Sequence, residues 1–282
     1  MLKFRDWVDP ARINYDYLSN NPNAIQFLEQ NPDKINNAYL SLNPEAIHIL
    51  ERNPRRIIWS CLSSNPSAIQ LLEKKMYNID WISLSSNPAA IHLLKQYPEK
   101  IYWKNLSSNP SAIHLLEANP EKIDWYNLSA NPGAIRLLEK FPKKIVWDKL
   151  SENPSAMCIL EKFPEKIDWY NLSSNPGAIR LLEKFPEKIV WNKLSENPAA
   201  RHILEANLDK ISWFNACKNP SLIHLLDENH GRIEWFVIPK NPAIFEYDYK
   251  GMKEKTSVFT EELMANRFHP KNVDRFESWG YE

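Results

Sequence analysis

The chain is poor in glycine and rich in proline, which is an unusual combination. It has 5 glycines and 21 prolines among 282 residues. Such a composition is common in disordered chains, but 43% of these residues are hydrophobic and 11 are tryptophan, as in proteins with a packed core. The prolines are therefore expected at ordered positions.

Cysteine motifs and long apolar segments are also missing. The three cysteines, Cys61, Cys158 and Cys217, lie far apart and outside any CxxC or Cys/His pattern, which argues against a disulfide framework and a zinc site. No stretch approaches the roughly 18 apolar residues of a membrane span, and the first residues, MLKFRDWVDPARINY, contain no apolar signal region. We expect a soluble protein of an intracellular, reducing compartment that does not bind membranes.

Neither an excess of charge nor a catalytic motif is present. The 35 basic and 35 acidic residues cancel, whereas dedicated nucleic-acid-binding proteins carry a net basic footprint. The sequence contains no GxGxxG, GxxxxGK[ST], HExxH or GxSxG. Its Ser, Glu, His and Lys residues recur in repeated columns, whereas a catalytic site occurs once. The composition therefore predicts a protein that is not an enzyme and needs no cofactor or metal.

What the sequence does contain is a tandem repeat. Asn-Pro recurs every 22 residues from Asn21 to Asn241, and the unit reads NPxAIxLLEx[N/F]PxKIxWxxLSx. Ten full copies fill residues 21–240, preceded by an N-terminal cap or partial repeat at 1–20 and followed by a degenerate repeat and cap at 241–282. The segment NPGAIRLLEKFP occurs at 131–142 and again at 175–186, which indicates duplication of a double repeat.

Each unit is predicted to form two short helices. Asn caps the first helix and Pro takes its first position, where no amide is lost. A second proline is expected to start another helix ten residues later, capped by Asp9, Asn31, Asn53 or Asn119 and less well by Tyr97 or Phe141. Because two helices of about two turns cannot bury their apolar faces alone, the units must stack. The predicted fold is an all-α solenoid of ten two-helix repeats with N- and C-terminal caps.

Two columns are assigned structural roles. Asparagine is the cap in every copy, although Ser, Thr or Asp would cap as well, so its amide is expected to donate to a backbone carbonyl of the adjacent unit as a ladder. The predicted structural caps are Asn43, Asn65, Asn87, Asn109, Asn131, Asn153, Asn175, Asn197 and Asn219. The predicted structural core is the tryptophan column, which comprises Trp59, Trp81, Trp103, Trp125, Trp147, Trp169, Trp191, Trp213 and Trp235.

One polar column on the first helix is a candidate recognition stripe, because it points away from the predicted core. Its members are Gln26, His48, Gln70, His92, His114, Arg136, Arg180, His202 and His224, with Cys158 in the same column. A shared metal ion is not expected there, since stacked helices lie roughly 8–10 Å apart. A solvated helix face remains the simpler interpretation.

A second column is a candidate basic stripe. It comprises Lys34, Arg56, Lys100, Lys122, Lys144, Lys166, Lys188, Lys210 and Arg232. The equal charge totals favour pairing of this column with the glutamate column that contains Glu29, Glu51 and Glu73. Left unpaired, the stripe would track the phosphates of a nucleic acid.

The ends differ from the repeats. Residues 243–257 lose the LLE pattern and are expected to form an irregular connector, with a helix from Thr260 to Phe268 and a degenerate second helix at 269–280. The repeat, together with the tail EEL…FHPKN…F…WG, resembles a family of tandem-repeat proteins of giant nucleocytoplasmic large DNA viruses, such as mimivirus relatives. The resemblance implies a virus-encoded member of an expanded family and assigns no catalytic or binding residue.

The sequence therefore predicts a non-enzymatic repeat scaffold for protein–protein interaction, with a host or viral protein as partner. One alternative is a helical-repeat protein that binds a single nucleic-acid strand. Another is a structural component of the virus particle held by end-to-end stacking. The sequence leaves open the oligomeric state and the choice between host cytoplasm and virion.

Overall fold

The structure is a computed structural model that describes residues 2–265. The chain divides into two compact units. One unit runs from Asp9 to Ile244, and the other combines residues 1–8 with residues 245–282. The two units are described separately.

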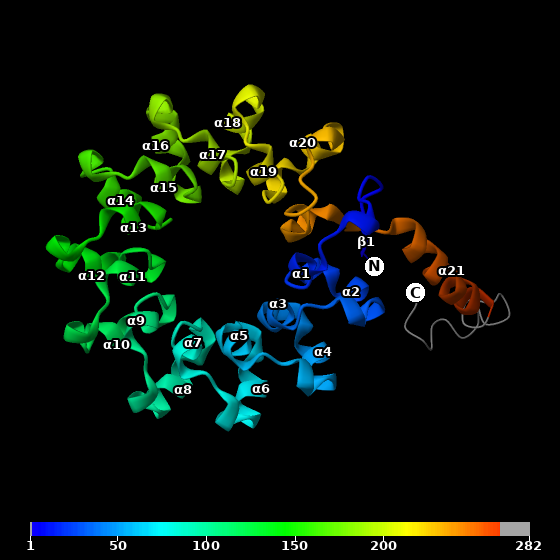
Figure 1. The fold of residues 1–282 in the computed structure, drawn as a ribbon, viewed down its shortest axis with the longest axis horizontal. Coiled ribbons are helices and arrows are strands. Elements are labelled where there is room, and N and C mark those ends of the chain that lie inside the picture. The colour runs from blue at the N-terminus through cyan, green and yellow to red at the C-terminus, as the bar shows by residue number, and fades with distance from the viewer. Residues whose placement is uncertain (1, 266–282) are drawn as a thin grey trace, which may run out of the picture. The chain divides into compact units, whose positions relative to one another are not determined.

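The Asp9–Ile244 unit is an all-α solenoid, as predicted. Most repeats run through a 3₁₀ turn at Asn-Pro, an outer α-helix, a second 3₁₀ turn and an inner α-helix (Figure 1). The repeat that starts at Asn153 lacks the first 3₁₀ turn, and the repeat that starts at Asn219 has the 3₁₀ turn Ile238–Lys240 in place of an inner α-helix. The outer helices are α2 (Ile25–Gln30), α4 (Ile47–Arg52), α6 (Ile69–Lys74), α8 (Ile91–Gln96), α10 (Ile113–Glu117), α12 (Ile135–Lys140), α14 (Met157–Leu160), α16 (Ile179–Lys184), α18 (Arg201–Glu205) and α20 (Ile223–Glu228). The inner helices are α1 (Tyr15–Leu18), α3 (Asn37–Leu42), α5 (Trp59–Ser64), α7 (Trp81–Ser85), α9 (Trp103–Leu106), α11 (Trp125–Ser129), α13 (Trp147–Glu152), α15 (Trp169–Ser173), α17 (Trp191–Leu194) and α19 (Trp213–Ala216).

The Asn-Pro pair starts the outer helix in the predicted way. Asn43 has extended backbone angles, φ −76° and ψ 116°, and its Oδ1 accepts a hydrogen bond from the Glu45 amide at 3.1 Å. Pro44 occupies the first position of the turn, where its missing amide costs nothing. The same acceptor geometry recurs at the Asn-Pro pairs from Asn21 to Asn241.

The predicted continuous second helix is wrong. In the segment 120–129 the 3₁₀ turn Pro120–Lys122 ends at Ile123, which is extended at φ −68° and ψ 127°, and α11 starts only at Trp125. The break arises because the Asp124 amide donates to Ser107 Oγ of the preceding repeat at 3.0 Å instead of joining a helix. The Asp124 carboxylate then caps α11 by accepting from the Asn127 amide at 2.9 Å.

The predicted caps of the second proline turn are also wrong for asparagine. Asp9 accepts from the Ala11 amide as expected. Asn31, Asn53 and Asn119 make no capping bond, and each amide instead donates to the carbonyl four residues earlier in its own outer helix. These asparagines therefore close the end of one helix rather than begin the next.

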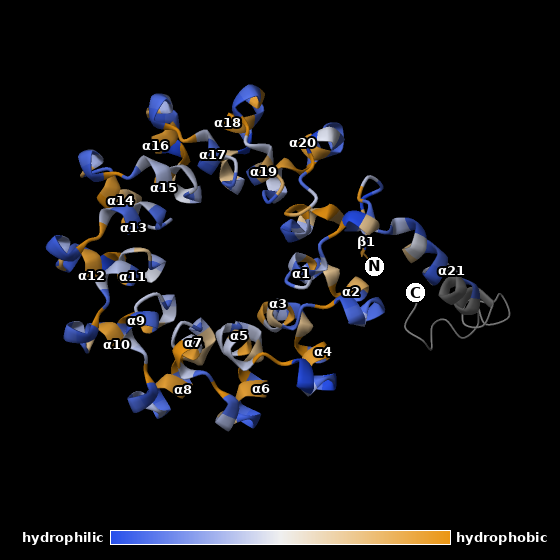
Figure 2. Ribbon diagram, viewed as in Figure 1, coloured by the Kyte–Doolittle hydropathy of each residue, from blue (hydrophilic) through white to orange (hydrophobic). Residues whose placement is uncertain are grey.

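The core lies between the two rows of helices, where Figure 2 shows the hydrophobic residues gathered, with hydrophilic residues at the periphery. It consists of leucine and alanine together with buried serine and asparagine; Leu94, Ala90, Ser85 and Asn87 are all 0% exposed. The tryptophan column is only half-buried, so its assignment to the core is corrected. Its indole rings lie between successive repeats at the boundary of the core.

The asparagine ladder closes the unit into a ring. Asn43 Nδ2 donates to the carbonyls of Ser19 and Asn21 in the preceding repeat, both at 3.0 Å. Asn21 has no such repeat before it, and its Nδ2 donates instead to Pro239 at 2.8 Å and to Asn241 at 3.2 Å. These are the equivalent carbonyls of the last repeat, so the first repeat stacks on the last in the same register (Figure 1).

The ring has eleven members rather than ten repeats between two caps. The eleventh repeat is composite, because Asn241–Ile244 supply its Asn-Pro turn and residues 9–20 supply its second half. Helix α1 packs against the 3₁₀ turn Ile238–Lys240, and Arg12 lies 4.3 Å from the ring centroid of Trp235. Residues 9–20 and 241–244 are therefore not caps, and the predicted extended stack with two free ends is replaced by a closed one.

The second unit contains a strand pair and a helix. Strand β1 (Leu2–Phe4) pairs antiparallel with β2 (Phe245–Tyr247), with Lys3 opposite Glu246, and α21 spans Tyr249–Ala265. The irregular connector predicted at 243–257 is wrong, since these residues form the end of the 3₁₀ turn Pro242–Ile244, β2 and the first half of α21. The predicted second helix at 269–280 lies outside the described residues.

Candidate interaction surfaces

The histidines of the candidate recognition stripe pair within the ring. His48 Nε2 lies 3.1 Å from Glu29 Oε1, and the glutamate is 19 residues earlier, in the preceding repeat. The same pairing joins His92 to Glu73 at 2.7 Å, His202 to Glu183 at 2.7 Å and His224 to Glu205 at 2.6 Å. These partly exposed side chains connect neighbouring outer helices, so they are less available to a partner than the sequence suggested.

The other members of the stripe are exposed. They are Gln26, Gln70, His114, Arg136 and Arg180. His114 lacks the pairing because Lys95 stands where the other repeats have the glutamate. The residues of the recognition stripe therefore all lie on the outer helices, but they differ in pairing and do not form a uniform binding surface.

The glutamate column pairs with a different set of basic residues from the one predicted. Lys140 Nζ lies 3.4 Å from Glu117, and Lys74 and Lys162 lie 3.9 Å from Glu51 and Glu139. At Glu205, the hydrogen bond from Arg201 and, to a smaller extent, the contact with His224 lower the pKa of the carboxyl group below its ordinary value. The predicted pairing of this column with the basic stripe is wrong.

The basic stripe instead lies against aromatic rings. Lys34 lies over Tyr15 at 4.5 Å, Lys122 over Trp103 at 4.6 Å, Lys210 over Trp191 at 4.5 Å and Arg232 over Trp213 at 5.7 Å, each measured to the ring centroid. Asn37 takes the place of tryptophan in the repeat before Arg56, and Arg56 donates a hydrogen bond to the Asn37 Oδ1 at 3.3 Å. These cations serve the contact between repeats, which makes them poor candidates for tracking phosphates.

The remaining lysines of the stripe, Lys100, Lys144, Lys166 and Lys188, follow repeats in which another side chain covers the tryptophan. The residue before the second proline is aromatic there, and it packs on the indole of the preceding repeat. The ring centroids are 5.4 Å apart for Trp81 and Tyr97, 5.3 Å for Trp125 and Phe141, 5.4 Å for Trp147 and Phe163, and 5.5 Å for Trp169 and Phe185. The alternation of Asn and aromatic residues at this position was visible in the sequence, where it was interpreted only as a difference in capping.

The inner helices present an arc of exposed aromatic side chains. In α11 the residues that pack inward are Leu128 and Ser129, both 0% exposed, whereas Tyr126 is 50% exposed. Its equivalents on this arc are Tyr170, Phe214 and Phe236, and exposure across the four ranges from 47% for Phe214 to 59% for Phe236. We call these four residues the aromatic arc.

Lysines lie over most of this arc. Lys149 Nζ is 5.0 Å from the ring centroid of Tyr126, Lys193 is 4.9 Å from Tyr170 and Lys218 is 4.6 Å from Phe214. Lys149 also donates to Glu152 at 2.8 Å, and this hydrogen bond raises the pKa of its ammonium group. Lys218 donates to Glu196 at 3.1 Å. The arc is therefore aromatic and mildly basic, with part of its charge already neutralised.

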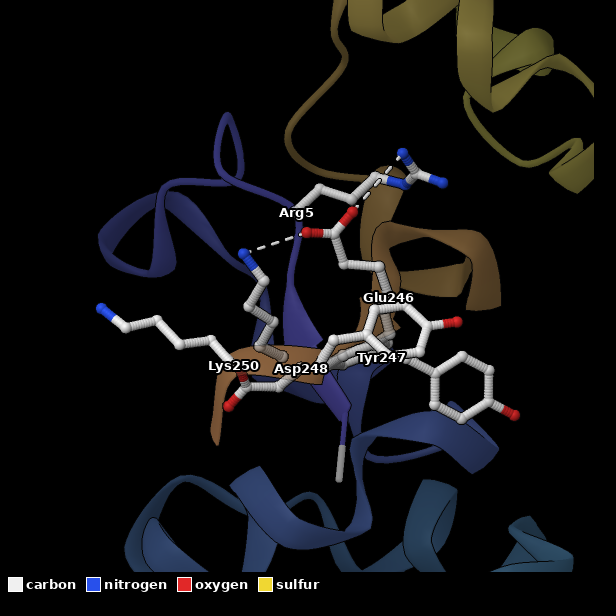
Figure 3. A pocket seen from close by; sticks show the side chains of 8 residues that line it. Arg5, Glu246, Tyr247, Asp248 and Lys250 are labelled. Carbon is white, nitrogen blue, oxygen red and sulfur yellow. Dashed lines mark ion pairs between the residues drawn. The ribbon is translucent and has the colours of Figure 1, made fainter. Parts of the chain in front are cut away.

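The unit that contains the strand pair has a cleft of about 760 Å³ beside β2. Glu246 lies between two basic residues in it, 3.0 Å from Lys3 and 3.9 Å from Arg5 (Figure 3). Hydrogen bonds to Asp6 and Glu246 raise the pKa of Lys3. Because Lys3, Arg5 and Glu246 are paired with one another, these three groups offer little to a charged ligand.

Within residues 2–265, no group of three or more His, Cys, Asp and Glu side chains is placed to hold a metal ion. In the same part of the chain, no helix has the length and apolar character needed to span a membrane.

Comparison of the chain with protein-family models, with curated proteins and with solved structures finds no match.

Proposed function

We propose that the chain is a non-enzymatic ring scaffold that binds a protein partner at the inner side of the ring. The observation that supports this most directly is the aromatic arc. Three of its aromatic side chains are about half-exposed on inner helices of alternate repeats, with Tyr126 at 50% and Tyr170 at 51%, and the fourth, Phe236, lies in the turn before Ile238–Lys240. Apolar groups gathered in this way on a protein surface are typical of interaction sites.

The ring leaves room for such a partner. Eleven inner elements spaced about 8–10 Å apart define a circle about 28–35 Å in diameter, and one helix diameter of about 10–12 Å must be subtracted. The opening is then about 16–25 Å wide. That width suits a single helix or a few extended strands, which the aromatic arc would contact along one side.

The second candidate is a nucleic-acid binder, because aromatic rings flanked by lysines also suit the bases and phosphates of a single strand. Three observations favour protein instead. The chain has no net charge, the ammonium groups of Lys149 and Lys218 are bonded to carboxylates, and much of the basic stripe lies over aromatic rings.

The resemblance of the repeat to those of giant DNA viruses supports a viral origin, with a host factor or a component of the particle as partner. A role as a virion component held by end-to-end stacking fits less well, because the Asn21 amide already donates to the Asn241 carbonyl of the same chain.

The test is affinity capture from host lysate with and without nuclease, at low and high salt. The wild type is compared with the double variant Tyr170→Ala/Phe214→Ala and with Tyr102→Ala, which removes a side chain that is 45% exposed outside the aromatic arc. Proteins retained through nuclease and high salt, and lost only from the double variant, support the scaffold. Nucleic acid that salt removes would favour the second candidate.

A further inference from the structure

Trp59 is the exception among the nine tryptophans of its column. Aromatic side chains cover Trp81, Trp125, Trp147 and Trp169, and cations lie over Trp103, Trp191, Trp213 and Trp235. In the described chain neither kind of group lies over the indole of Trp59.

The next repeat explains this. It reads Lys75-Met76-Tyr77-Asn78 where others read Asn-Pro-Glu-Lys or Phe-Pro-Glu-Lys. Lys75 stands at the position whose side chain, when aromatic, covers the tryptophan of the preceding repeat. Asn78 stands at the position of the lysine or arginine that covers this tryptophan in other repeats. The short amide of Asn78 provides no cation for the ring.

A cleft of about 440 Å³ lies at this position. Its apolar wall includes Ile57, Leu71 and Trp59, and its rim carries Arg55, Lys75 and Tyr77, of which Tyr77 is 82% exposed. The one acidic residue of the lining, Glu51, lies 3.9 Å from Lys74. Arg55 and Lys75 are exposed, and neither has an acidic partner among the described residues.

We propose that this cleft binds an aromatic side chain of a partner polypeptide, flanked by carboxylates. The four covered tryptophans show that the same surface accepts an aromatic ring, at centroid distances of 5.3–5.5 Å. The surface also accepts a cation in other repeats, but here Arg55 and Lys75 would repel one. The same two cations favour carboxylates beside the bound ring.

The groove at Trp191 is the matched comparison. It has the same positions in its lining, but Lys210 lies over the indole, Glu187 replaces Arg55 and Asn207 replaces Lys75. Asn78→Lys should therefore close the Trp59 cleft by copying a contact that the fold already uses. Lys210→Asn should uncover Trp191 without supplying the two cations.

The proposal rests on the proposed function in that the partner is a polypeptide, but it concerns a different surface. The probe is a short, dye-labelled peptide with one phenylalanine between glutamates, measured by fluorescence anisotropy on the full chain. Control peptides carry alanine in place of phenylalanine, or lysines in place of the glutamates.

We expect the phenylalanine–glutamate peptide to bind at least about tenfold more tightly than either control peptide, and Asn78→Lys to weaken it by about as much. Arg55→Glu/Lys75→Glu should shift the preference toward the lysine-flanked peptide, a change that a merely structural defect would not cause. Lys210→Asn should leave binding unchanged.

Equal binding by wild type and Asn78→Lys would overturn the proposal, and so would equal binding of the alanine peptide or tighter binding of the lysine-flanked one. Loss of peptide binding in Tyr170→Ala/Phe214→Ala, with Asn78→Lys unaffected, would place the peptide on the aromatic arc. That result would reject the cleft and leave the proposed function standing.

Discussion

At the scale of single residues, the capping asparagine of each repeat makes three hydrogen bonds through its side chain. Asn109 Oδ1 accepts from the Ser111 amide at 3.0 Å, and Nδ2 donates to the carbonyls of Ser85 and Asn87 at 3.1 and 2.9 Å. The side chain is 0% exposed, so no water replaces these partners. Asp or Ser would keep the cap but lose both bonds to the neighbouring repeat.

Asn109→Asp is therefore expected to cost more than Asn109→Ser, although aspartate is the closer match in shape. The serine variant removes the side-chain donor from the Ser85 carbonyl and one of the two donors from the Asn87 carbonyl, which still accepts from the Ala90 amide, a loss of about 1–3 kcal/mol in the free energy of unfolding. The aspartate variant also buries a carboxylate against those carbonyls and should cost about 3–5 kcal/mol. Urea denaturation measures both.

Asn119→Ser is the control for this pair, because Asn119 donates only within its own repeat, to Leu115 at 2.9 Å. Its cost should stay near 1 kcal/mol or below. If Asn109→Ser were no more costly than Asn119→Ser, the donated bonds would not be what holds the repeats together.

Cys217 stands in a column that is otherwise largely serine. Ser195 Oγ accepts the Ser212 amide at 3.0 Å and donates to the Trp191 carbonyl at 2.8 Å, whereas Cys217 Sγ accepts from the Glu234 amide at 3.3 Å. Cys217→Ser should strengthen these contacts and stabilise the protein by about 0.5–1.5 kcal/mol at neutral pH.

The stability of the wild type should also fall in alkali relative to Cys217→Ser. Burial raises the pKa of the Cys217 thiol in the folded chain above its ordinary value of 9.0. The unfolded chain therefore releases this proton first as the pH rises, and stability is lost from about pH 9 upward. Denaturation curves at neutral and alkaline pH should diverge for the two proteins, and parallel curves would contradict the assignment.

At the scale of secondary-structure elements, the sequence predicted correctly those helix starts that depend on contacts between residues close in the chain. The Asn-Pro turn begins the outer helix because its cap and its proline act within three residues of one another. The second predicted helix failed because the group that breaks it, Ser107 Oγ, comes from 17 residues earlier. The assignment of the tryptophan column to the core was wrong for a similar reason, since the side chains that cover the indoles belong to the next repeat.

The start of the inner helix provides a matched pair of substitutions. Asp124 caps α11, whereas Val146 stands at the same position before α13 and makes no side-chain cap. Asp124→Val should destabilise by about 0.5–2 kcal/mol, and Val146→Asp should stabilise by up to about 1 kcal/mol. Thermal or urea denaturation of both variants measures this, and a loss from both would mean that packing, rather than capping, selects the residue at this position.

At the scale of the whole ring, the two half-repeats at its ends were visible in the sequence, although their meaning was not. Asp9-Pro10 and Arg12 keep the register of a second half-repeat, and Asn241-Pro242 keeps that of a first half. Interpreted separately, each suggests a cap; only the stacking geometry shows that together they make one repeat. Closure depends on the angle between successive repeats, which no residue pattern encodes directly.

The seam of the ring lacks one contact that the other joints have. Pro239 stands in the serine column and has no hydroxyl to accept an amide, so that ladder is interrupted there. The contacts across the seam include those of Asn21 and of Arg12 over Trp235, together with a hydrogen bond from Asn23 to the Pro242 carbonyl and the contact of Lys240 with Tyr17. Asn21→Ala/Arg12→Ala removes about 2–4 kcal/mol of contacts and should open the ring while leaving the other repeats folded.

Opening should raise the radius of gyration in small-angle scattering and speed hydrogen exchange in residues 9–30 and 219–244, with protection retained between them. Because the variant lacks the Asn21 amide, its two ends cannot join through the ladder, and both the variant and the wild type should stay monomeric with rising concentration in sedimentation experiments. An unchanged radius and unchanged exchange would show that closure depends on other contacts. A wild type that associates with rising concentration would show that its ladder ends are not joined to each other, and would restore the end-to-end stacking that a closed ring disfavours.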